Sequence, residues 1–381
     1  MSDVMMDLDA VDKFYGSIDK GVHAVRNVSM QVMRGEIIAL LGSSGCGKTS
    51  TLRMVAGFEA VSRGKISIGG REIHMLPPVQ RNVAMAFEGY SLYPTVTVRD
   101  NISFALKRKN ISATDVANKV EEIAAMLEIT NMLDKYPSSI SGGQQQRASL
   151  ARALIRDADL YLLDEPMGQL EPQLRTLLRG RIKSYIKERG LTAILVTHDQ
   201  TEANALADRI AVMEDGELQQ FASPDEIKKS PANLFTGTFV GEPPMNVFPA
   251  AASISETTVS LQLEGDVALT YPSDAFSPQL RARLTEMRDV ILGVRPYAVQ
   301  RRDTGSPATV VANQWLGDQS HIAANFAGGS LVLVEHDRTQ LTEDQQITVH
   351  LEPSDIHIFN PQTGMAISHG ARLVEIGRAH V

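Results

Sequence analysis

Residues 40–50 read LLGSSGCGKTS and form the most informative stretch of the sequence. They fit the pattern G-x-x-x-x-G-K-[ST], whose fixed positions fall at Gly42, Gly47, Lys48 and Thr49. Small residues let backbone N–H groups converge on a β-phosphate, the lysine adds a positive charge, and the threonine offers a hydroxyl to Mg²⁺. The loop therefore predicts a site for the polyphosphate of a nucleoside triphosphate. It does not indicate what the energy of that nucleotide drives.

The sequence on either side of this phosphate loop agrees with such a site. Residues 36–41 form a short apolar run, which is typical of a buried parallel strand. Residues 48–56 read as a helix that ends at Gly57. The N-terminus of that helix then points at the phosphates, where free N–H groups favour an anion. A chance loop rich in glycine and serine is the alternative, and the flanking strand and helix count against it.

Length and composition fit a globular protein of two domains. The chain has 381 residues, of which 43% are hydrophobic and 22% are charged. No apolar run approaches the ~18 residues of a membrane span, and the N-terminus lacks the pattern of a secretory signal. Cys46 is the only cysteine, so an intrachain disulfide is impossible and a reducing cytoplasm is expected. The net charge of −8 gives no support for nucleic acid as the main partner.

The hydrophobic pattern divides the chain into two predicted domains. Residues 1–235 combine buried-type strands with helices, as an α/β domain does, and residues from about 89 to 150 are mostly helical. Residues 236–374 carry short β-like runs with no long helices between them, which predicts a small all-β barrel. Residues 375–381 read like the translation of a sequencing adapter and are set aside as a non-native tail.

Three polar residues follow apolar runs later in the chain. Asp164 ends the run at residues 160–163, a position that puts a carboxylate beside the Mg²⁺ of a phosphate loop. Glu165 comes next and is placed to activate a water molecule against the γ-phosphate. His198 follows the run at residues 192–197, so it would emerge at the same edge of the sheet. A lone histidine is more often a surface or core residue, but this position favours contact with the γ-phosphate.

A second glycine-containing helix start is formed by Ser141, Gly142, Gly143 and Gln144. Its bare backbone N–H groups and its serine hydroxyl predict another anion-binding helix N-terminus. One nucleotide does not need two separate glycine cradles from the same chain. A second subunit that supplies this cradle to the nucleotide of the first explains the pair, whereas an ordinary glycine-rich turn is the alternative.

The motifs resemble those of the ATP-binding subunits of ABC transporters. They stand in the order of that family: the phosphate loop, a Q-loop region near Glu88, the signature at residues 141–144, Asp164 with Glu165, and then His198. The resemblance covers residues 4 to about 240 and implies an ABC ATPase fold with a helical subdomain.

Three further stretches resemble a narrower group, the ATPase subunits of bacterial carbohydrate importers, which contains the maltose and glycerol-3-phosphate systems. They are LYPTVTV at residues 92–98, FVGEPPMN at residues 239–246 and GVRP at residues 293–296. This group carries an OB-like regulatory module, also called TOBE, after its ATPase domain. The resemblance implies the same module in residues 236–374.

The resemblance implies ATP and Mg²⁺ as ligands and a role for each matching residue. Tyr15, which alone reads as an ordinary core or turn aromatic, would stack on adenine. The ATP phosphates would be held by the loop residues Gly42, Ser43, Ser44, Gly45, Cys46, Gly47, Lys48, Thr49 and Ser50. The metal ligands would be Thr49 (or Ser50), Asp164 and Glu88. The general base would be Glu165 and the switch histidine His198, while residues 141–144 would contact ATP bound by the other subunit.

Two positions depart from the family pattern. Where the Q-loop usually has glutamine, this chain has Glu88, which keeps an oxygen for Mg²⁺ but adds negative charge beside a triphosphate. Where the D-loop usually ends in aspartate, residues 168–171 read GQLE and end in the longer acid Glu171. The base and the phosphate loop are intact, so hydrolysis is expected to be retained, while its rate and coupling stay open.

The resemblance also implies partners. The chain would pair with a second ATPase subunit, and a homodimer is favoured over a heterodimer whose other loops are standard. Two transmembrane permease subunits would be contacted through the segment near residues 88–97, and a substrate-binding protein indirectly, at the cytoplasmic face of the inner membrane. The cargo would be a sugar, polyol or glycerol phosphate. The rival hypotheses are a soluble ABC-type ATPase of DNA repair or translation, a subunit with weakened hydrolysis in a heteromeric pair, and a scaffold with a vestigial ATPase.

Overall fold

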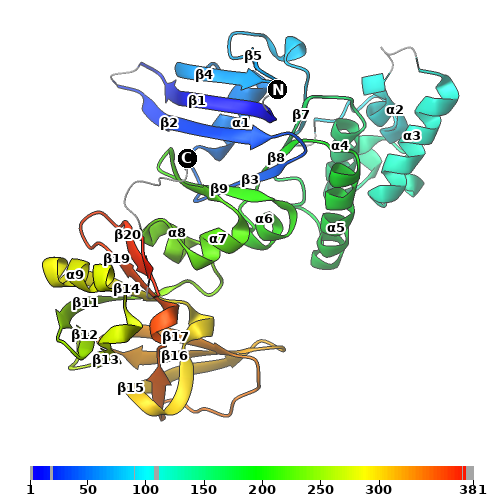
Figure 1. Cartoon of the computed structure of the whole chain (residues 1–381). Coiled ribbons are helices and arrows are strands. Elements are labelled where there is room, and N and C mark those ends of the chain that lie inside the picture. Colours follow the sequence, from blue (N-terminus) through cyan, green and yellow to red (C-terminus); the bar gives the residue numbers. More distant parts are fainter. Residues whose placement is uncertain (1–2, 18–19, 90, 107–110, 371, 375–381) are drawn as a thin grey trace. The chain divides into compact units, whose positions relative to one another are not determined.

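The computed structural model describes residues 3–17, 20–89, 91–106, 111–370 and 372–374. The chain divides between Pro224 and Asp225 into two compact units (Figure 1). The seven residues expected to be a non-native tail, 375–381, lie outside the described residues. In the described ranges, no helix is both long enough and apolar enough to cross a membrane.

The first unit is built on a six-stranded sheet with the strand order β10-β9-β3-β8-β7-β6. Its strands are β3 (Ile37–Gly42), β6 (Val83–Ala86), β7 (Leu160–Asp164), β8 (Ala193–Val196), β9 (Arg209–Glu214) and β10 (Glu217–Ala222). Neighbouring strands are parallel, except that β9 and β10 form an antiparallel hairpin. Every residue of β3, β7 and β8 is buried, as their unbroken apolar runs predict. The carboxyl ends of β3, β8, β7 and β6 therefore meet at one edge of the sheet.

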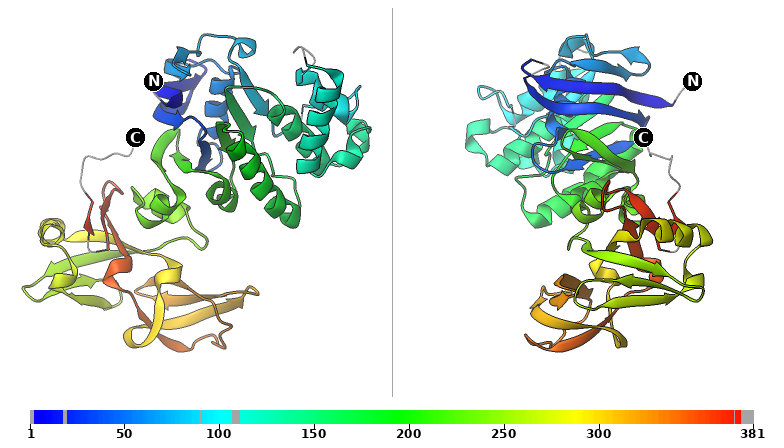
Figure 2. Two further views of the ribbon diagram at one scale, coloured as in Figure 1. Left: turned by 45° about the vertical axis from the view of Figure 1, so that its right-hand side comes forward. Right: turned by 90° about the vertical axis from the view of Figure 1, so that its left-hand side faces the viewer.

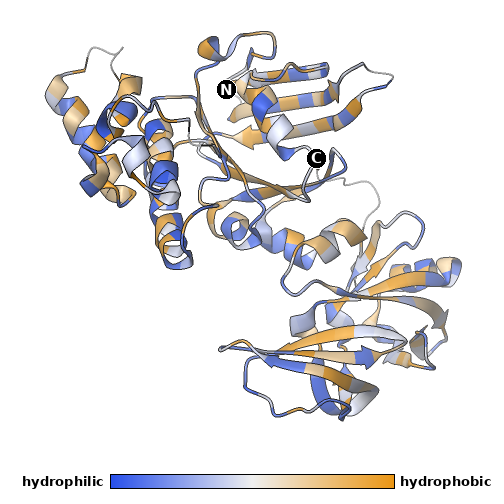
Figure 3. Ribbon diagram, turned by 180° about the vertical axis from the view of Figure 1, so that it is seen from behind, coloured by the Kyte–Doolittle hydropathy of each residue, from blue (hydrophilic) through white to orange (hydrophobic). Residues whose placement is uncertain are grey.

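A second sheet in this unit is antiparallel and has the order β2-β1-β4-β5. It contains β1 (Val4–Tyr15), β2 (Val22–Met33), β4 (Arg63–Ile68) and β5 (Arg71–Glu72). The helix α1 (Lys48–Ala56) shares its core: Met6 and Leu8 of β1, Leu52 and Met54 of α1, and Ile38 of β3 belong to one buried cluster. In Figure 3, many of the residues along the strands of both sheets are hydrophobic.

The remaining helices of this unit include α2 (Val98–Ser103), α3 (Ala113–Met126), α4 (Gly142–Leu154), α5 (Pro172–Glu188) and α6 (Gln200–Leu206). α2 and α3 pack against α4 and form a group of helices to one side of the sheets (Figures 1 and 2). Thr97, Ser112 and Ser141 cap α2, α3 and α4 by accepting a backbone N–H bond, which explains where these helices begin.

The second unit consists mainly of antiparallel sheet. One sheet has the order β13-β12-β11-β14-β19-β20-β21 and the other the order β17-β16-β15-β18. Their strands are β11 (Asn246–Ile254), β12 (Thr258–Gln262), β13 (Ala268–Pro272), β14 (Asp289–Val294), β15 (Gln300–Trp315), β16 (Ser320–Phe326), β17 (Gly329–Glu335), β18 (Gln346–His350), β19 (Ile356–Phe359), β20 (Ala366–His369) and β21 (Arg372–Leu373). Both sheets contribute to one core, in which Phe248 of β11 and Ile322 of β16 are buried. The predicted β character of this part is confirmed.

One helix of the second unit, α9 (Pro278–Met287), was not predicted. The sequence does contain its signals. Ser277 caps the helix, Pro278 occupies its first turn, and Leu280 and Leu284 lie four residues apart and are fully buried. The helix is only ten residues long and lies between β-like runs, so its apolar spacing is difficult to distinguish from that of the strands beside it.

The division of the chain falls earlier than the predicted boundary after residue 235. The helices α7 (Pro224–Lys229) and α8 (Leu234–Phe239) belong with the second unit. The buried Arg295 explains this, since its guanidinium donates to the carbonyl oxygens of Gly237, at 2.7 Å, and of Val240. These charge-assisted bonds fix the end of α8 to the strand that Arg295 follows.

Candidate functional site

The phosphate loop joins β3 to α1, which begins at Lys48. Gly47 caps the helix with a φ of 102°, a conformation that favours glycine. A Cβ atom at Gly42 would come within 2.2 Å of a backbone carbonyl oxygen of β9, so only glycine fits there. Lys48 Nζ donates to the carbonyl oxygens of Gly42 and Ser43, at 2.8 Å in both cases. The ammonium group is therefore held at the loop, where a phosphate would need its charge.

The loop is anchored to the β9–β10 hairpin. Ser43 Oγ donates to Glu214 Oε2 at 2.6 Å, and the N–H of Gly216 donates to the carbonyl of Cys46 at 3.2 Å. Cys46 is 2% exposed, and burial raises the pKa of its thiol. The thiol thus packs beneath the loop. Around a Cβ atom placed on Gly45 there is no atom within 4 Å, so the loop is open on that side.

Tyr15 lies at the end of β1 with 39% of its surface exposed. Its hydroxyl is 3.1 Å from Ser50 Oγ, which brings the ring beside the first turn of α1. Lys13 Nζ lies 4.7 Å from the ring centroid and is paired with Glu59 at 2.8 Å. An exposed ring in this position suits a stacked base. Ser50, the alternative to Thr49 as a metal ligand, therefore has its hydroxyl in contact with Tyr15.

Two acids reach the sheet edge from neighbouring strands. Asp164 is the last residue of β7, and Glu88 follows β6, with Ala86 opposite Leu163 in the parallel ladder. Asp164 is 4% exposed, and its Oδ1 is buried with no hydrogen-bond partner among the described residues. Burial, and then the negative charges of Glu88 and Glu165, raise the pKa of Asp164 to about 6.

The carboxylate of Asp164 fits a role as a Mg²⁺ ligand. A buried carboxylate oxygen without a partner is costly unless a cation or a donor satisfies it. Within the described part of the chain, no group of three or more His, Cys, Asp or Glu residues could hold a metal ion alone. Mg²⁺ usually takes one or two carboxylates and completes its shell with phosphate oxygens and water. The residues present therefore suit Mg²⁺ that binds together with a nucleotide.

Glu165 is held in an unusual backbone conformation, with a φ of 47°. Its N–H donates to the carbonyl of Val196 at 2.9 Å, and its own carbonyl accepts from Gln146 Nε2 at 2.7 Å. Its Oε2 lies 2.9 Å from Nδ1 of His198, although the pair lacks the geometry of a hydrogen bond. The histidine side chain is 75% exposed, whereas the side chain of Glu165 is only 16% exposed and its Oε2 is buried. The structure thus brings Glu165 and His198 together.

Sequence reasoning missed Gln146, which is 3% exposed. Besides its bond to Glu165, its Oε1 accepts from the backbone N–H of Gln169 in the D-loop, at 3.0 Å. One side chain therefore links α4 to the candidate base and to the D-loop. Gln146 is the last of three consecutive glutamines, and no sequence signal distinguishes it from the other two.

The signature residues form the start of α4. Ser141 Oγ accepts from the N–H of Gln144 at 3.4 Å, and Gln144 Oε1 accepts from the N–H of Ser141 at 2.8 Å. This reciprocal capping box fixes the helix N-terminus. No hydrogen bond described in the structure joins residues 141–144 to the phosphate loop of the same chain. The start of α4 is formed without any such bond.

The D-loop is connected to the segment that carries His198. Arg175 donates to the carbonyl of Leu170 at 3.2 Å and to Asp199 Oδ2 at 3.1 Å. Asp199 in turn caps α6. Glu171 is exposed, and its side chain does not cap α5. The carboxylate of Glu171 therefore lies at the surface of the D-loop.

Glu202 is a second buried residue that sequence reasoning missed. It is 2% exposed, and its Oε2 accepts from the hydroxyl of Thr197 at 2.7 Å. Burial raises the pKa of Glu202 to about 7, the Thr197 bond opposes this shift, and the charges of Asp199 and Glu165 add to it. A titratable group is therefore hydrogen-bonded to the side chain of Thr197, the residue just before His198.

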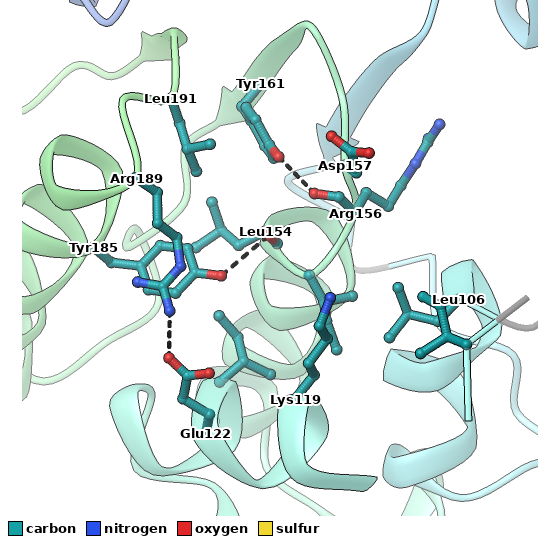
Figure 4. A pocket seen from close by; sticks show the side chains of 13 residues that line it. Leu106, Lys119, Glu122, Leu154, Arg156, Asp157, Tyr161, Tyr185, Arg189 and Leu191 are labelled. Carbon is teal, nitrogen blue, oxygen red and sulfur yellow. Dashed lines mark hydrogen bonds and ion pairs between the residues drawn. The ribbon is translucent and has the colours of Figure 1, made fainter. Parts of the chain in front are cut away.

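A pocket of about 430 Å³ lies elsewhere in the first unit (Figure 4). It is lined by residues of α3, the ends of α4 and α5, and the start of β7. Arg189 stacks on the ring of Tyr185, 4.0 Å from its centroid, and pairs with Glu122. The pocket includes Tyr161 near the start of β7, whereas Asp164 ends that strand. The pocket is therefore separate from the phosphate site.

Comparisons with known proteins agree with this geometry. The model of the ABC transporter family matches residues 25–168, which include the phosphate loop, the signature and the Asp164–Glu165 pair. The model of the TOBE domain matches residues 292–359 in the second unit. Together they confirm the predicted order of an ABC ATPase domain followed by a TOBE-like β domain.

Relatives match over most of the chain. A sulfoquinovosyl glycerol transport ATP-binding protein of Agrobacterium fabrum is 36% identical over 363 residues, which cover 94% of this chain and 98% of that protein. A trehalose/maltose import ATP-binding protein of Thermococcus litoralis is 39% identical and covers 91% and 96%. An sn-glycerol-3-phosphate import ATP-binding protein of Cereibacter sphaeroides is 37% identical and covers 90% and 95%.

Solved structures resemble the first unit. One of them is a dimeric ATP-binding cassette in a post-hydrolysis state, bound to ADP and phosphate. It is 26% identical with a TM-score of 0.54, and the match covers 57% of this chain and 98% of that one.

Proposed function

The chain belongs to the family of ABC transporter ATP-binding proteins, and from this premise we propose that it is the energy-coupling ATPase of a bacterial importer. One observation carries the assignment. Asp164, Glu165 and His198 lie together at the edge of the sheet where β3 ends and the phosphate loop begins. The names of the relatives support a sugar, polyol or glycerol phosphate as cargo.

Hydrolysis in this site is a transfer of the γ-phosphoryl group to water. Glu165 takes a proton from the attacking water, a bond forms between that oxygen and the γ-phosphorus, and the bond to the β–γ bridging oxygen breaks. His198 lies 2.9 Å from the carboxylate of Glu165, at the sheet edge where the γ-phosphate would be contacted. Lys48 compensates the negative charge that gathers on the phosphates. Such a reaction needs positioned groups and charge compensation more than covalent catalysis.

The metal in this reaction would be held by Thr49 and Asp164, with Glu88 as a further oxygen ligand. Bound Mg²⁺ supplies neutralisation of charge on the β- and γ-phosphates. The buried, unpartnered Oδ1 of Asp164 supports this role.

Each active site would be shared between two subunits. The start of α4 in one chain would contact ATP held by the phosphate loop of its partner, through Ser141 to Gln144. Two observations support the pairing: the capping box is complete without the chain's own phosphate loop, and a related cassette was solved as a dimer bound to ADP and phosphate. A homodimer is the simpler assembly.

The ATPase pair would bind two permease subunits at the cytoplasmic face of the membrane. The segment at residues 88–97 follows β6 and would pass the state of the nucleotide to the permease. A substrate-binding protein would be coupled only indirectly, and the TOBE-like unit would be regulatory.

A heteromeric ATPase pair is the second candidate, in which this chain hydrolyses ATP weakly. Glu88 and Glu171 favour this candidate, because both differ from the residues usual in the family and lie in the Q-loop and the D-loop, which come after the phosphate loop in the sequence. An ATPase acting on nucleic acid is not supported by the relatives, whose names are those of transport proteins.

Purification of the tagged full-length chain from detergent-solubilised membranes of its own host tests the proposal. Mass spectrometry is expected to find two permease subunits, and the reconstituted complex should hydrolyse ATP faster with its cargo and binding protein. A second ATPase in equal amount would favour the heteromeric pair. Recovery without any membrane protein, together with ATPase stimulation by DNA or RNA, would overturn the importer assignment.

A further inference from the structure

Glu88 lies at the sheet edge where Asp164 ends the neighbouring strand. It follows β6, whose last residue, Ala86, pairs with Leu163 directly before Asp164. The side chain of Glu88 is exposed. Its charge is the largest influence on the pKa of Asp164 after burial itself. The parallel ladder of β6 and β7 also places Glu88 and Asp164 at the same edge of the sheet, at the ends of neighbouring strands.

Negative charge in this part of the site is not balanced by the protein alone. Asp164 keeps a buried oxygen with no hydrogen-bond partner among the described residues, and Glu165 adds a further carboxylate. Lys48 and Arg53 oppose the charge of Asp164, but the ammonium of Lys48 is shared with two loop carbonyls. A triphosphate brings several more negative charges to the same place.

We propose that Glu88 makes nucleotide binding by this chain more dependent on a divalent cation than a glutamine at the same position would. Without the cation, its carboxylate repels both the phosphates and Asp164. With Mg²⁺ bound, the same charge is attracted instead. Glutamine has the same length and a similar oxygen but no charge, so it would lack both effects. The inference rests on the proposed function and deepens it, because the segment after Glu88 would then respond to MgATP and not to free ATP.

Calorimetric titration of the full-length chain with ATP tests this linkage. The wild type and Glu88→Gln are each titrated in excess EDTA and in saturating MgCl₂. In EDTA, Glu88→Gln is expected to bind ATP about tenfold more tightly than the wild type, because one nearby repulsive charge is gone. In MgCl₂ the two affinities should agree within about twofold, since the lost attraction is partly replaced by the amide oxygen.

Glu188→Gln is the matched control. Glu188 is the exposed last residue of α5, which leads into the start of β8 at the opposite edge of the sheet. The substitution Glu188→Gln removes the same charge as Glu88→Gln. It should leave the affinity for ATP unchanged both in EDTA and in MgCl₂. Equal affinities of wild type and Glu88→Gln in EDTA, or equal shifts in both conditions, would overturn the proposal. A wild type that binds no ATP even with MgCl₂ would contradict the proposed function instead.

Discussion

Gln146 Nε2 donates to the backbone carbonyl of Glu165 across 2.7 Å. The same side chain accepts from the N–H of Gln169. The helix that begins with the signature residues is thus connected directly to the candidate base and to the D-loop of its own chain. A displacement of α4 by a partner's nucleotide would be transmitted to the backbone of Glu165.

Gln146→Met is expected to lower kcat by about tenfold or more with little change in ATP affinity, because the base loses its support while the phosphate loop is intact. Stability should fall by about 1–2 kcal/mol, since two backbone groups lose a buried partner. Gln145→Met is the control. Gln145 also makes two side-chain bonds, but to the carbonyls of Pro137 and Ile140. Equal kcat losses in the two variants would refute a specific link to Glu165.

Tyr15→Ala is expected to weaken MgATP binding by about tenfold, which corresponds to the loss of one base–aromatic stack. Tyr15→Phe keeps the ring and loses only the contact with Ser50, so its affinity should stay near that of the wild type. GTP binding should fall in parallel, because stacking does not read the base edge. Fluorescence titration measures these affinities, and unchanged ATP binding by Tyr15→Ala would exclude the stacking role.

Glu202→Gln is expected to change how stability depends on pH. The pKa of Glu202 rises from 4.5 to about 7 on folding, chiefly through burial. Between these values the folded protein holds a proton that the unfolded chain has lost. The contribution of Glu202 to the free energy of unfolding is thus fully present below pH 4.5. It falls as the pH rises to about 7, and it is constant above that pH.

The amide in Glu202→Gln does not titrate and can still accept from Thr197, so it removes this loss. The variant should match the wild type near pH 4.5 and be more stable at pH 8, by an amount of the order of 1–3 kcal/mol. Thermal unfolding of the first unit at several pH values measures the difference. Asp199, Glu165 and Arg175 surround the group in both proteins and act as a common background. A pH-independent difference would show that Glu202 is already ionised in the folded state.

Local patterns in the sequence predicted at which helix and strand ends several candidate residues lie. Residues 48–56 were expected to form a helix, and α1 has these bounds. Asp164 and His198 were expected at strand ends on one sheet edge, and the parallel ladders of β7 and β8 put them there. These predictions succeeded because strand, loop and helix follow one another within a few residues, so nearby residues carry the information.

Other parts of the site depend on contacts between distant segments. Gln146 acts through a carbonyl 19 residues away, and Arg175 reaches Asp199 from 24 residues away. Glu202 differs from a surface glutamate only by burial, which the pattern of a short helix does not reveal. The helix α9 was missed for a different reason, because its capping signals are short and lie among β-like runs. A side-chain hydrogen bond to a distant part of the backbone produces no regular spacing of residues by which the sequence could predict it.

The role of Glu165 as the general base is tested by the rate of ATP hydrolysis by Glu165→Gln, measured beside the wild type under the same conditions. Glutamine keeps the shape of the side chain but cannot take the proton from water. The variant is expected to bind MgATP as tightly as the wild type, to accumulate as an ATP-bound dimer, and to hydrolyse ATP at no more than about one hundredth of the wild-type rate. Hydrolysis at the wild-type rate would contradict the assignment of Glu165 as the base, and with it the account of this sheet edge as the active site.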